Sequence, residues 1–454
     1  MRCKLKFFFL ENFHLSRFGK VIFHGIIFNH WVFQDCRNIQ RILRFPVGLK
    51  IVDFSLGEKY SHCGILVVII QPDVGMKKEK GARAKSSIHI AITGGETAGH
   101  VYAGIAVAKE IKRQIPSAKI LFIGTEKGME AKIVPQEGFT LEMIEIRGGL
   151  NKSFGNTIKS LSRVPREVLS ALKLLRKFRP SVVLGIGGYV SVPVIYAAYL
   201  LHVPTMILES NRQPGLANRL LSRSVDKIAI GFEESLRVFP KKKVILTGNP
   251  VRREFYLIGE TPPPDKGRKL NILVIGGNRG ARSMNYSLIA ALDYLKAQRD
   301  RLTFTHQTGN TDFTYVRVGY EKRQFRAEVY QYIKDIPKMY ARAHLVICRA
   351  GATTIAELKV SGRPSILIPY PYDDRHQEFN ALALQEDGMA KIIAQPQLTG
   401  KSLAEAILQI LENPEELAQV WPNTRQFREK DATEQVVQAC LQLATGKDLA
   451  DIEA

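Results

Sequence analysis

The residues between Cys348 and Glu357 have the types and spacing that could bind a phosphorylated ligand. A buried-strand pattern ends at Cys348, the small residues Gly351 and Ala352 make a turn, and a helical pattern follows. Small residues let the backbone approach a phosphate closely, and the free N–H groups of a first helical turn can hold a diphosphate. The hydroxyls of Thr353 and Thr354, at the start of this helix, could also hold the diphosphate. The alternative is an ordinary tight turn in which Thr353 caps a helix.

A second polar cluster follows the next predicted strand, Ser365 to Pro369. It runs from Pro371 to Ala381 and opens another helix. The carboxyl ends of neighbouring parallel strands lie at one edge of a sheet, so both clusters should reach one crevice. Glu357, about one turn into the first helix, could accept hydrogen bonds from ribose hydroxyls there. A simple helix cap would not explain this second cluster.

Glycine-rich loops follow several other predicted strands. The first is 94–100, after the strand Ile88 to Ile92, and the second domain repeats the pattern at 276–282 after Asn271 to Ile275. Small or polar loops also occur at 187–191 and 209–218. None is a Walker loop, because no Gly-Lys-Ser/Thr follows. The further predicted strands are 120–124, 141–146, 182–184, 205–208, 303–306, 344–348, 365–368 and 390–393. Strands that alternate with helical stretches predict parallel, doubly wound sheets.

The amino-acid composition indicates which classes of partner the protein can bind. The 454 residues carry a formal net charge of +22, which calls for an anionic partner or surface. We expect no nucleic acid, because the chain has neither zinc-ligand spacing nor an RNA-binding signature. Five scattered cysteines suit a reducing compartment better than a disulfide framework. No apolar run reaches the roughly 20 residues of a membrane-spanning helix.

Residues 1–85 differ from the rest, with three of the five cysteines and many Phe, His and basic residues. Only 64–70 resembles a strand, and the apolar run after Met1 is too short for a signal peptide. Met76 followed by a lysine-rich run resembles a protein start. We therefore expect 1–85 to be an extension, disordered or arising from a misassigned start, and residues 1–75 to have no part in the fold. Mass spectrometry of the native N-terminus would test this, and an intact Met1 peptide would contradict it.

The remaining chain divides at a linker, Thr247 to Gly267, which contains a run of three prolines. The predicted domains are 86–251, facing acceptor and membrane, and 252–428, binding a sugar nucleotide. Residues 429–454 should form a C-terminal helix that can pack back on the first domain. The predicted fold class is α/β, with two doubly wound, Rossmann-like domains facing each other across a cleft. This is the arrangement of the GT-B glycosyltransferases.

Six motifs, in order and spacing, resemble the MurG family of bacterial N-acetylglucosaminyltransferases. They are Gly94–His100, Gly187–Ser191, Gly248–Arg252, Gly276–Ala281, Cys348–Ala352 with Glu357, and Asp431–Glu434. The resemblance covers about residues 86–445. It implies an inverting transfer of GlcNAc from UDP-GlcNAc to the C4 hydroxyl of the muramoyl sugar of lipid I, giving lipid II. It also implies a peripheral enzyme on the cytoplasmic face of the bacterial inner membrane, without cofactor or metal, with the anionic membrane surface and cell-wall synthesis proteins as candidate partners.

The resemblance also assigns site residues. The positions that match the family's UDP-GlcNAc site are Thr97, Ala98, Gly99, Asn211, Arg252, Asn278, Ile333, Ala352, Thr353, Thr354, Ile355, Ala356, Glu357 and Gln377. The backbone of Ile333 is expected to read the uracil. His100 is the candidate base on chemical grounds, because an inverting transfer needs one group to take the acceptor proton.

Each assignment has a structural alternative. His100 could only orient the glycine loop, and Arg252 could only make an ion pair at the domain boundary. Glu357 could only favour its helix turn, and Gln377 could be a plain surface residue. The sequence also departs from the family pattern at Glu96, at Asn278 with Arg279, and at His376. Glu96 places a negative charge where a diphosphate is expected.

The segment 161–179 alternates apolar and basic residues at helical spacing. Its apolar members are Leu161, Val164, Val168, Leu172 and Leu175, and its basic members are Arg163, Arg166, Lys173, Arg176, Lys177 and Arg179. Such a helix can lie on an anionic leaflet, and we expect membrane contact here. The alternative is a helix whose apolar side faces the core and whose basic side faces water.

Other functions remain open at this point. A related GT-B enzyme with another acceptor, or a UDP-GlcNAc epimerase, would share the sugar-nucleotide half. A non-catalytic scaffold at the site of cell-wall assembly would keep the fold without turnover, and Glu96 is the feature that favours it.

Overall fold

The computed structural model describes residues 49–54, 65–70, 88–95, 97–145, 164–258, 269–277, 280–413 and 431–446. The chain forms two compact units, residues 1–85 and 86–454. In the first unit, β1 (Leu49–Phe54) pairs with β2 (Ile65–Ile70) in an antiparallel register. The strand expected at 64–70 is β2, whereas β1 was not predicted. The hypothesis that residues 1–75 have no part in the fold stays a prediction.

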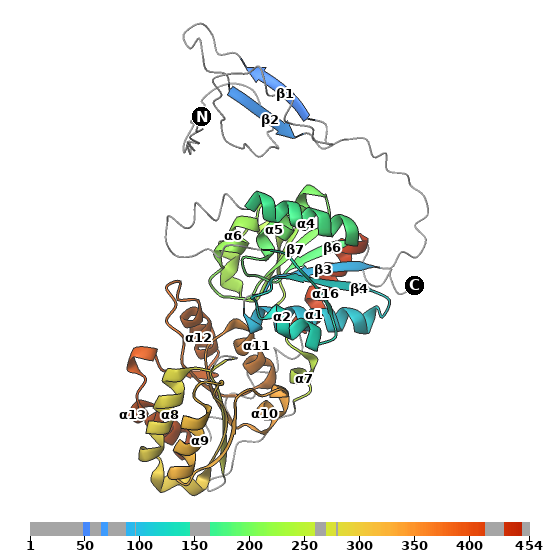
Figure 1. Cartoon of the computed structure of the whole chain (residues 1–454). Helices are drawn as coiled ribbons and strands as arrows, with labels where there is room; N and C mark the ends of the chain where they lie inside the picture. The colour runs from blue at the N-terminus through green and yellow to red at the C-terminus, as the bar shows by residue number, and fades with distance from the viewer. Residues whose placement is uncertain are drawn as a thin grey trace, which may run out of the picture. The chain divides into compact units, whose positions relative to one another are not determined.

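The first domain of the second unit is built on a seven-stranded parallel sheet (Figure 1). Its order is β5 (Thr140–Met143), β4 (Lys119–Gly124), β3 (His89–Thr93), β6 (Val182–Gly185), β7 (Thr205–Glu209), β8 (Lys227–Ile230) and β9 (Val244–Leu246). The strands β8 and β9 were missed by sequence reasoning. The central strands are apolar on both faces because helices cover both sides of the sheet.

Successive residues of β3 point to opposite faces and so belong to two different cores. Ile90 and Ile92 pack with α1 (Ala98–Gln114), α2 (Glu130–Gln136) and α16 (Ala432–Thr445), whereas Ala91 packs with α4 (Val164–Phe178), α5 (Ser191–Leu200) and α6 (Leu216–Leu221). Figure 1 shows α16, in red, beside α1. The last helix among the described residues therefore completes the first domain, although the second domain precedes it in sequence.

The second domain repeats this plan with six parallel strands. Their order is β12 (Arg326–Tyr330), β11 (Leu302–Gln307), β10 (Leu270–Ile275), β13 (Leu345–Cys348), β14 (Ser365–Leu367) and β15 (Ala390–Ile392). One face carries α8 (Arg282–Tyr294), α9 (Phe313–Lys322) and α13 (Gly400–Glu412), and the other carries α7 (Arg253–Tyr256), α10 (Ile336–Arg342), α11 (Ala352–Ser361) and α12 (His376–Glu386). The edge strand β12 was not predicted.

Short 3₁₀ helices complete the described chain: η2 (Glu233–Arg237), η3 (Lys241–Lys243), η4 (Lys296–Arg301) and η5 (Gln395–Gln397). In both sheets the first strand of the domain is internal, with the second strand on one side and the fourth on the other. Ligands of such sheets bind where the order reverses, at the carboxyl ends of these strands. In this chain those ends are the glycine loops after β3 and β6, and those after β10 and β13. The prediction of two Rossmann-like domains is confirmed.

The apolar side of α4 corrects our expectation of membrane contact. Val168 and Leu175 are 7% and 1% exposed, and Leu172 packs against the same core. These side chains are buried because α4 covers the sheet, so they are not available to a bilayer. Leu161 and Arg163 lie outside the described residues, and so does the side chain of Val164. The basic side chains from Arg166 to Arg179 are exposed, as the core-facing alternative requires.

In the part of the chain that the structure describes, no helix is long and apolar enough to cross a membrane.

Candidate active site

The first glycine loop leads from β3 into α1 and is held against the loop that follows β6. Gly94 adopts a φ of +136°, and a Cβ at this position would lie 2.4 Å from the carbonyl oxygen of Gly187. The N–H of Gly95 donates to that same oxygen at 3.2 Å. Only glycine permits this backbone conformation and this approach. The two loops at the switch point of the first sheet therefore form one unit. Glu96 lies outside the described residues.

His100 lies in the first turn of α1, with its ring against Gly187. Its Nδ1 is 3.0 Å from the carbonyl oxygen of Gly95 and 3.2 Å from the hydroxyl of Thr97. Since a carbonyl oxygen can only accept, Nδ1 carries a hydrogen, and in the neutral ring the lone pair is then on Nε2. A Cβ at Gly187 would lie 3.0 Å from Nε2. The loop therefore orients the imidazole, as the alternative reading proposed, and it does so in the tautomer that a base needs.

Thr97 begins α1 as its N-cap residue. Its hydroxyl accepts a hydrogen bond from the N–H of His100 at 3.4 Å. Ala98 and Gly99 occupy the first turn. Their position at the amino end of a helix gives them free N–H groups and a favourable dipole for an anion.

The first turn of α11 meets the first turn of α1. Gly351 is the N-cap residue of α11, and the hydroxyl of Thr353 donates to the carbonyl oxygen of Gly99 at 3.0 Å. Two helix amino termini, one from each domain, are thereby joined by a direct hydrogen bond. Ala352, Thr354, Ile355 and Ala356 complete the predicted stretch, in which Ile355 and Ala356 also pack in the core. Converging positive helix ends suit a diphosphate.

Arg252 and Glu357 form an ion pair of 3.2 Å between Nη2 and Oε1, and their side chains are 11% and 12% exposed. The guanidinium lies 4.6 Å from the centre of the Tyr102 ring. Burial raises the pKa of Glu357, although Arg252 opposes that shift. No hydrogen bond to Oε2 of Glu357 occurs among the described residues, so this oxygen can still face a ribose hydroxyl. The ion-pair and ligand-binding readings are thus compatible.

Tyr102 was not predicted as a site residue. Its hydroxyl makes a 2.7 Å hydrogen bond with that of Tyr332, which precedes Ile333. The bond joins α1 of the first domain to the segment expected to read a uracil base. The only indication in the sequence was the polar hydroxyl of Tyr102 on the helix that follows the glycine loop.

Ile333 is 5% exposed, and its N–H donates to Oε1 of Gln307 at 2.8 Å. The side-chain nitrogen of Gln307 donates in turn to the carbonyl oxygen of Gly277 at 2.9 Å. Gln307 therefore ties the Ile333 segment to the second glycine loop. Sequence reasoning missed Gln307, although a polar residue at the carboxyl end of a strand could have drawn attention to it. Asn278 and Arg279 lie outside the described residues.

Asn211 contacts the second domain through its side chain, whereas Gln377 binds a backbone N–H within the second domain. The N–H of Asn211 donates to Glu209 at 2.9 Å, and its side-chain oxygen accepts from Asn380 of α12 at 3.1 Å. Gln377 accepts from the N–H of Tyr370 at 2.9 Å, which leaves its side-chain nitrogen for another partner. Asn380 is fully buried and was not predicted.

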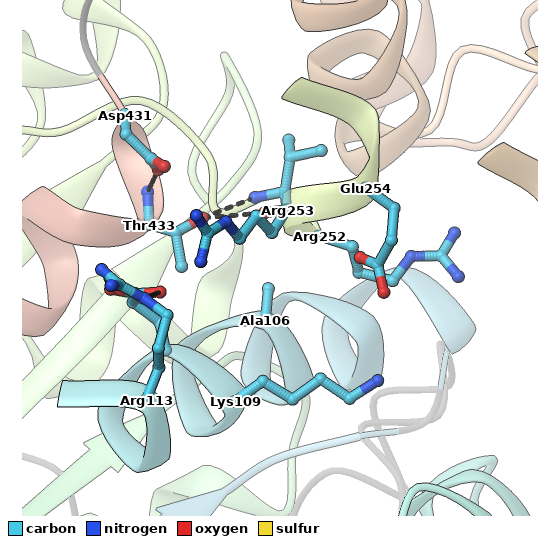
Figure 2. Close-up of a pocket in the computed structure, with 10 residues that line it drawn as sticks. Ala106, Lys109, Arg113, Arg252, Arg253, Glu254, Asp431 and Thr433 are labelled. Atoms are coloured by element: carbon cyan, nitrogen blue, oxygen red, sulfur yellow. Dashed lines mark hydrogen bonds and ion pairs between the residues drawn. The ribbon is translucent and has the colours of Figure 1, made fainter. Parts of the chain in front are cut away.

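A separate cavity of about 190 Å³ lies where the chain crosses between the domains (Figure 2). It is lined by α1, by residues 251–254 and by the start of α16. Thr433 both accepts from the N–H of Val251, at 3.1 Å, and donates to its carbonyl oxygen, at 2.8 Å. In Figure 2 the guanidinium of Arg252 points away from Asp431 and Thr433. Of the predicted site residues, only Arg252 lines this cavity, which lies at the crossover between the domains and not at the glycine loops.

Within the described ranges, no group of three or more His, Cys, Asp and Glu side chains could hold a metal ion. Among the described residues of the site, Arg252 carries a full positive charge, and the two helix amino termini add partial positive charge.

Comparisons with known proteins agree with this geometry. The glycosyltransferase family 28 N-terminal domain matches residues 90–230, and the C-terminal domain of the same family matches residues 271–436.

Curated relatives extend the match over most of the chain. One from Myxococcus xanthus is 40% identical over 375 residues, covering 80% of this chain and 97% of the relative. Another, from Syntrophotalea carbinolica, is 40% identical over 351 residues, covering 77% and 97%. Both are named "UDP-N-acetylglucosamine--N-acetylmuramyl-(pentapeptide) pyrophosphoryl-undecaprenol N-acetylglucosamine transferase".

Solved structures agree with these sequence comparisons. MurG from Acinetobacter baumannii superposes with a TM-score of 0.63 at 28% identity, covering 78% of this chain and 99% of that one. A UDP-GlcNAc 2-epimerase from Neisseria meningitidis has a TM-score of 0.54 at 14% identity, with 79% and 100% covered. The epimerase shares the fold alone.

Proposed function

The chain belongs to the MurG family of UDP-N-acetylglucosamine:N-acetylmuramyl-(pentapeptide) pyrophosphoryl-undecaprenol N-acetylglucosamine transferases, and we propose that its two helix amino termini and His100 carry out the transfer. The enzyme is an N-acetylglucosaminyltransferase that acts in peptidoglycan synthesis. Its donor is UDP-GlcNAc and its acceptor is lipid I. Because the relatives are transferases, the family relationship favours transfer over the scaffold and epimerase alternatives.

The Thr353–Gly99 hydrogen bond is the observation that carries the residue assignments. It brings the amino ends of α1 and α11 together, so a diphosphate beside them would face N–H groups from both domains. We place the uracil at Ile333, whose carbonyl oxygen can accept the base N3–H, since its N–H is already used by Gln307. Glu357 would bind the ribose through Oε2. The remaining donor contacts would come from Asn211, Asn278, Gln377 and Arg252.

Transfer then follows as a direct displacement. The C4 hydroxyl of the muramoyl sugar attacks C1 of GlcNAc from the face opposite UDP, and Nε2 of His100 takes the hydroxyl proton. The bond between C1 and the diphosphate oxygen breaks, and UDP leaves with the electron pair. The helix termini stabilise the negative charge that develops on the diphosphate. Configuration at C1 is therefore inverted.

The acceptor is lipid-linked, so the first domain should contact an anionic membrane, at the cytoplasmic face of the inner membrane. The amino edge of its sheet lies opposite the carboxyl edge that carries His100, but it has exposed apolar side chains, whereas the apolar side of α4 is buried. Helices α4, α5 and α6 all end at this edge, because each precedes the next parallel strand. Tyr199, Leu200 and Leu220 are 44%, 45% and 61% exposed there. Exposed basic side chains accompany them: Arg176, Lys177, Arg179, Arg219, Arg223, Lys241 and Lys242.

Exposed apolar side chains accompanied by exposed basic ones are typical of a peripheral membrane surface. Each Lys or Arg near an anionic leaflet contributes about 1 kcal/mol of attraction. The test is sedimentation with vesicles of anionic and of zwitterionic lipid. We expect binding to anionic vesicles only, and at least tenfold weaker binding for a Leu200→Ser and Leu220→Ser double variant. Equal binding of the variant would contradict this surface. Cell-wall synthesis proteins remain candidate partners.

The function is tested by transfer of radiolabelled GlcNAc from UDP-GlcNAc to a short-chain lipid I analogue in detergent. We expect one labelled product with a β linkage and one UDP released per transfer. His100→Asn keeps a donor for the Gly95 carbonyl but removes the base, so turnover should fall about 10²- to 10⁴-fold with little change in the donor KM. His202→Asn is the matched control, because His202 is exposed and asparagine tolerates its positive φ. Full turnover of His100→Asn would rule out the base assignment.

A further inference from the structure

Arg212 connects the two domains through a shared ion pair. Its guanidinium makes two parallel contacts with Glu386 at the end of α12, of 3.1 Å to Oε1 and 2.8 Å to Oε2. The same Nη2 lies 2.6 Å from Glu234 of η2, in its own domain. The Arg212 side chain is 17% exposed, whereas Glu234 and Glu386 are 40% and 58% exposed. A forked contact of this kind has both strength and a defined geometry.

The backbone of Arg212 is held by the same helix. Its N–H donates to Oδ1 of Asn380 at 3.0 Å, and the side-chain nitrogen of Asn380 donates to Oδ1 of Asn211 at 3.1 Å. That nitrogen also lies 3.3 Å from the carbonyl oxygen of Ala350, one residue before the N-cap of α11. Asn380 therefore ties the loop 209–215 to the amino end of α11. The ion pair of Arg212 fixes the far end of the helix that carries Asn380.

Having one partner in each domain makes the contact releasable. If α12 moves away with Glu386, Arg212 still has Glu234, so no partly buried charge is left unpaired. The cost of breaking the contact is then small, whereas a lone buried arginine would strongly resist separation. The arrangement holds the domains together without locking them.

We propose that Arg212 is a positioning residue for the transfer, a clamp that holds α12 against the loop 209–215 so that Asn211 and the amino end of α11 reach the donor together. The inference rests on the proposed donor site. It predicts an asymmetry between the two carboxylates. Loss of Glu386 should weaken donor binding, and loss of Glu234 should not.

The decisive comparison is Glu386→Gln against Glu234→Gln, with Arg237→Gln as a matched surface control. For Glu386→Gln we expect the KM for UDP-GlcNAc to rise about 3- to 10-fold, with kcat at saturating donor within about twofold of the unsubstituted enzyme. For Glu234→Gln and Arg237→Gln we expect the KM within about twofold. Equal effects of the two glutamate substitutions, or no effect of either, would overturn the clamp.

The salt dependence of the KM is a second measurement, and a purely structural role of Arg212 would not change it. The pair is partly exposed, so 0.5 M NaCl should screen it and raise the KM of the unsubstituted enzyme towards that of Glu386→Gln. The variant itself should respond little. Calorimetric binding of UDP-GlcNAc, which needs no acceptor, separates the possible failures. Binding without transfer would count against the proposed function, whereas binding that Glu386→Gln leaves unchanged would count against the clamp.

Discussion

The first and second domains share one strand order but hold their functional groups in different ways. In the first, His100 is placed by main-chain oxygen and by the missing side chain of Gly187. In the second, the Ile333 segment is held by Gln307, and behind it His306 bonds to Asn285 and Tyr320 in a buried network. The topology alone therefore does not decide how a site is held.

This difference predicts two kinds of failure. Where a side chain is positioned by backbone oxygens and by the space beside a glycine, a substitution should displace it through a steric clash, and kcat should fall. A site held by buried polar side chains should fail through unpaired groups, and the loss should appear in ligand affinity and in stability. Substitutions in each domain can separate the two.

The largest effect is expected in the first domain, for Gly187→Ala. Gly187 has a φ of +98°, and its new Cβ would lie 3.0 Å from Nε2 of His100 and 3.1 Å from Cδ2. The imidazole must move, so kcat should fall about 100-fold, within the range expected for His100→Asn. UDP-GlcNAc affinity should stay within about twofold. The measurements are transfer kinetics and calorimetric binding.

Gly138→Ala is the matched control, because Gly138 also has a positive φ, +81°, but a Cβ there would meet nothing within 4 Å. It carries the backbone strain of about 1–2 kcal/mol without the clash. If Gly138→Ala lowered kcat as much as Gly187→Ala, strain rather than the position of His100 would explain the loss.

The second domain should show the opposite pattern in Gln307→Leu. The substitution leaves the buried N–H of Ile333 without its acceptor and removes the bond to Gly277. A buried unpaired donor costs roughly 1–3 kcal/mol, so UDP-GlcNAc should bind about tenfold more weakly. At saturating donor, kcat should stay within about twofold. An unchanged dissociation constant would show that Gln307 does not position the uracil segment.

The sequence predicted most of the fold because buried parallel strands leave continuous apolar runs, as at His344 to Cys348. It missed β8 and β9, which are only four and three residues long. It missed β12 because that edge strand is largely uncovered and reads Arg-Ala-Glu-Val-Tyr, without such a run. Length alone does not decide, since β14 and β15, of three residues each, were predicted. Edge position, which β9 and β12 share, removes the continuous apolar run on which the prediction depends.

The same distinction applies to the site. His100 and the α11 turn were predicted as site residues because glycines lie next to them in the sequence. Asn380 and Arg212 could not, because their partners Asn211 and Glu386 lie 169 and 174 residues away. For Gln307, whose partner Ile333 lies 26 residues away, the only indication was its place at the carboxyl end of a strand. Long-range polar contacts leave no local spacing. The apolar side of α4 was misread for a related reason, since periodicity cannot say whether a core or a membrane covers it.

The buried network of the second domain also predicts a pH dependence. His306 is fully buried, and burial lowers its pKa to about 3. Since the unfolded chain binds the proton near pH 6.5 and the folded chain does not, the stability from this group is present above pH 6.5 and is lost as pH falls towards 3.

In His306→Gln, the unfolding free energy should fall less steeply with acid. The difference from the unsubstituted enzyme should be about 1.4 kcal/mol per pH unit between pH 6 and pH 4. Urea denaturation at several pH values measures it. The first domain offers the contrast, because His202→Asn, at an exposed position, should leave the slope unchanged. Parallel slopes for His306→Gln and the unsubstituted enzyme would mean that His306 is not buried in the neutral form.

The smallest effect is expected where the two domains meet, for Tyr102→Phe. The substitution removes the 2.7 Å bond to Tyr332 but keeps the ring 4.6 Å from the Arg252 guanidinium. Tyr332 is 41% exposed, so water can replace the lost partner, and the KM for UDP-GlcNAc should rise less than threefold. Tyr102→Leu also removes the aromatic face under Arg252 and should cost more, because a partly desolvated cation–π contact contributes about 1–2 kcal/mol. If Tyr102→Phe lowered affinity as much as Tyr102→Leu, the hydroxyl contact would be the main connection between the domains, and the ring would matter little.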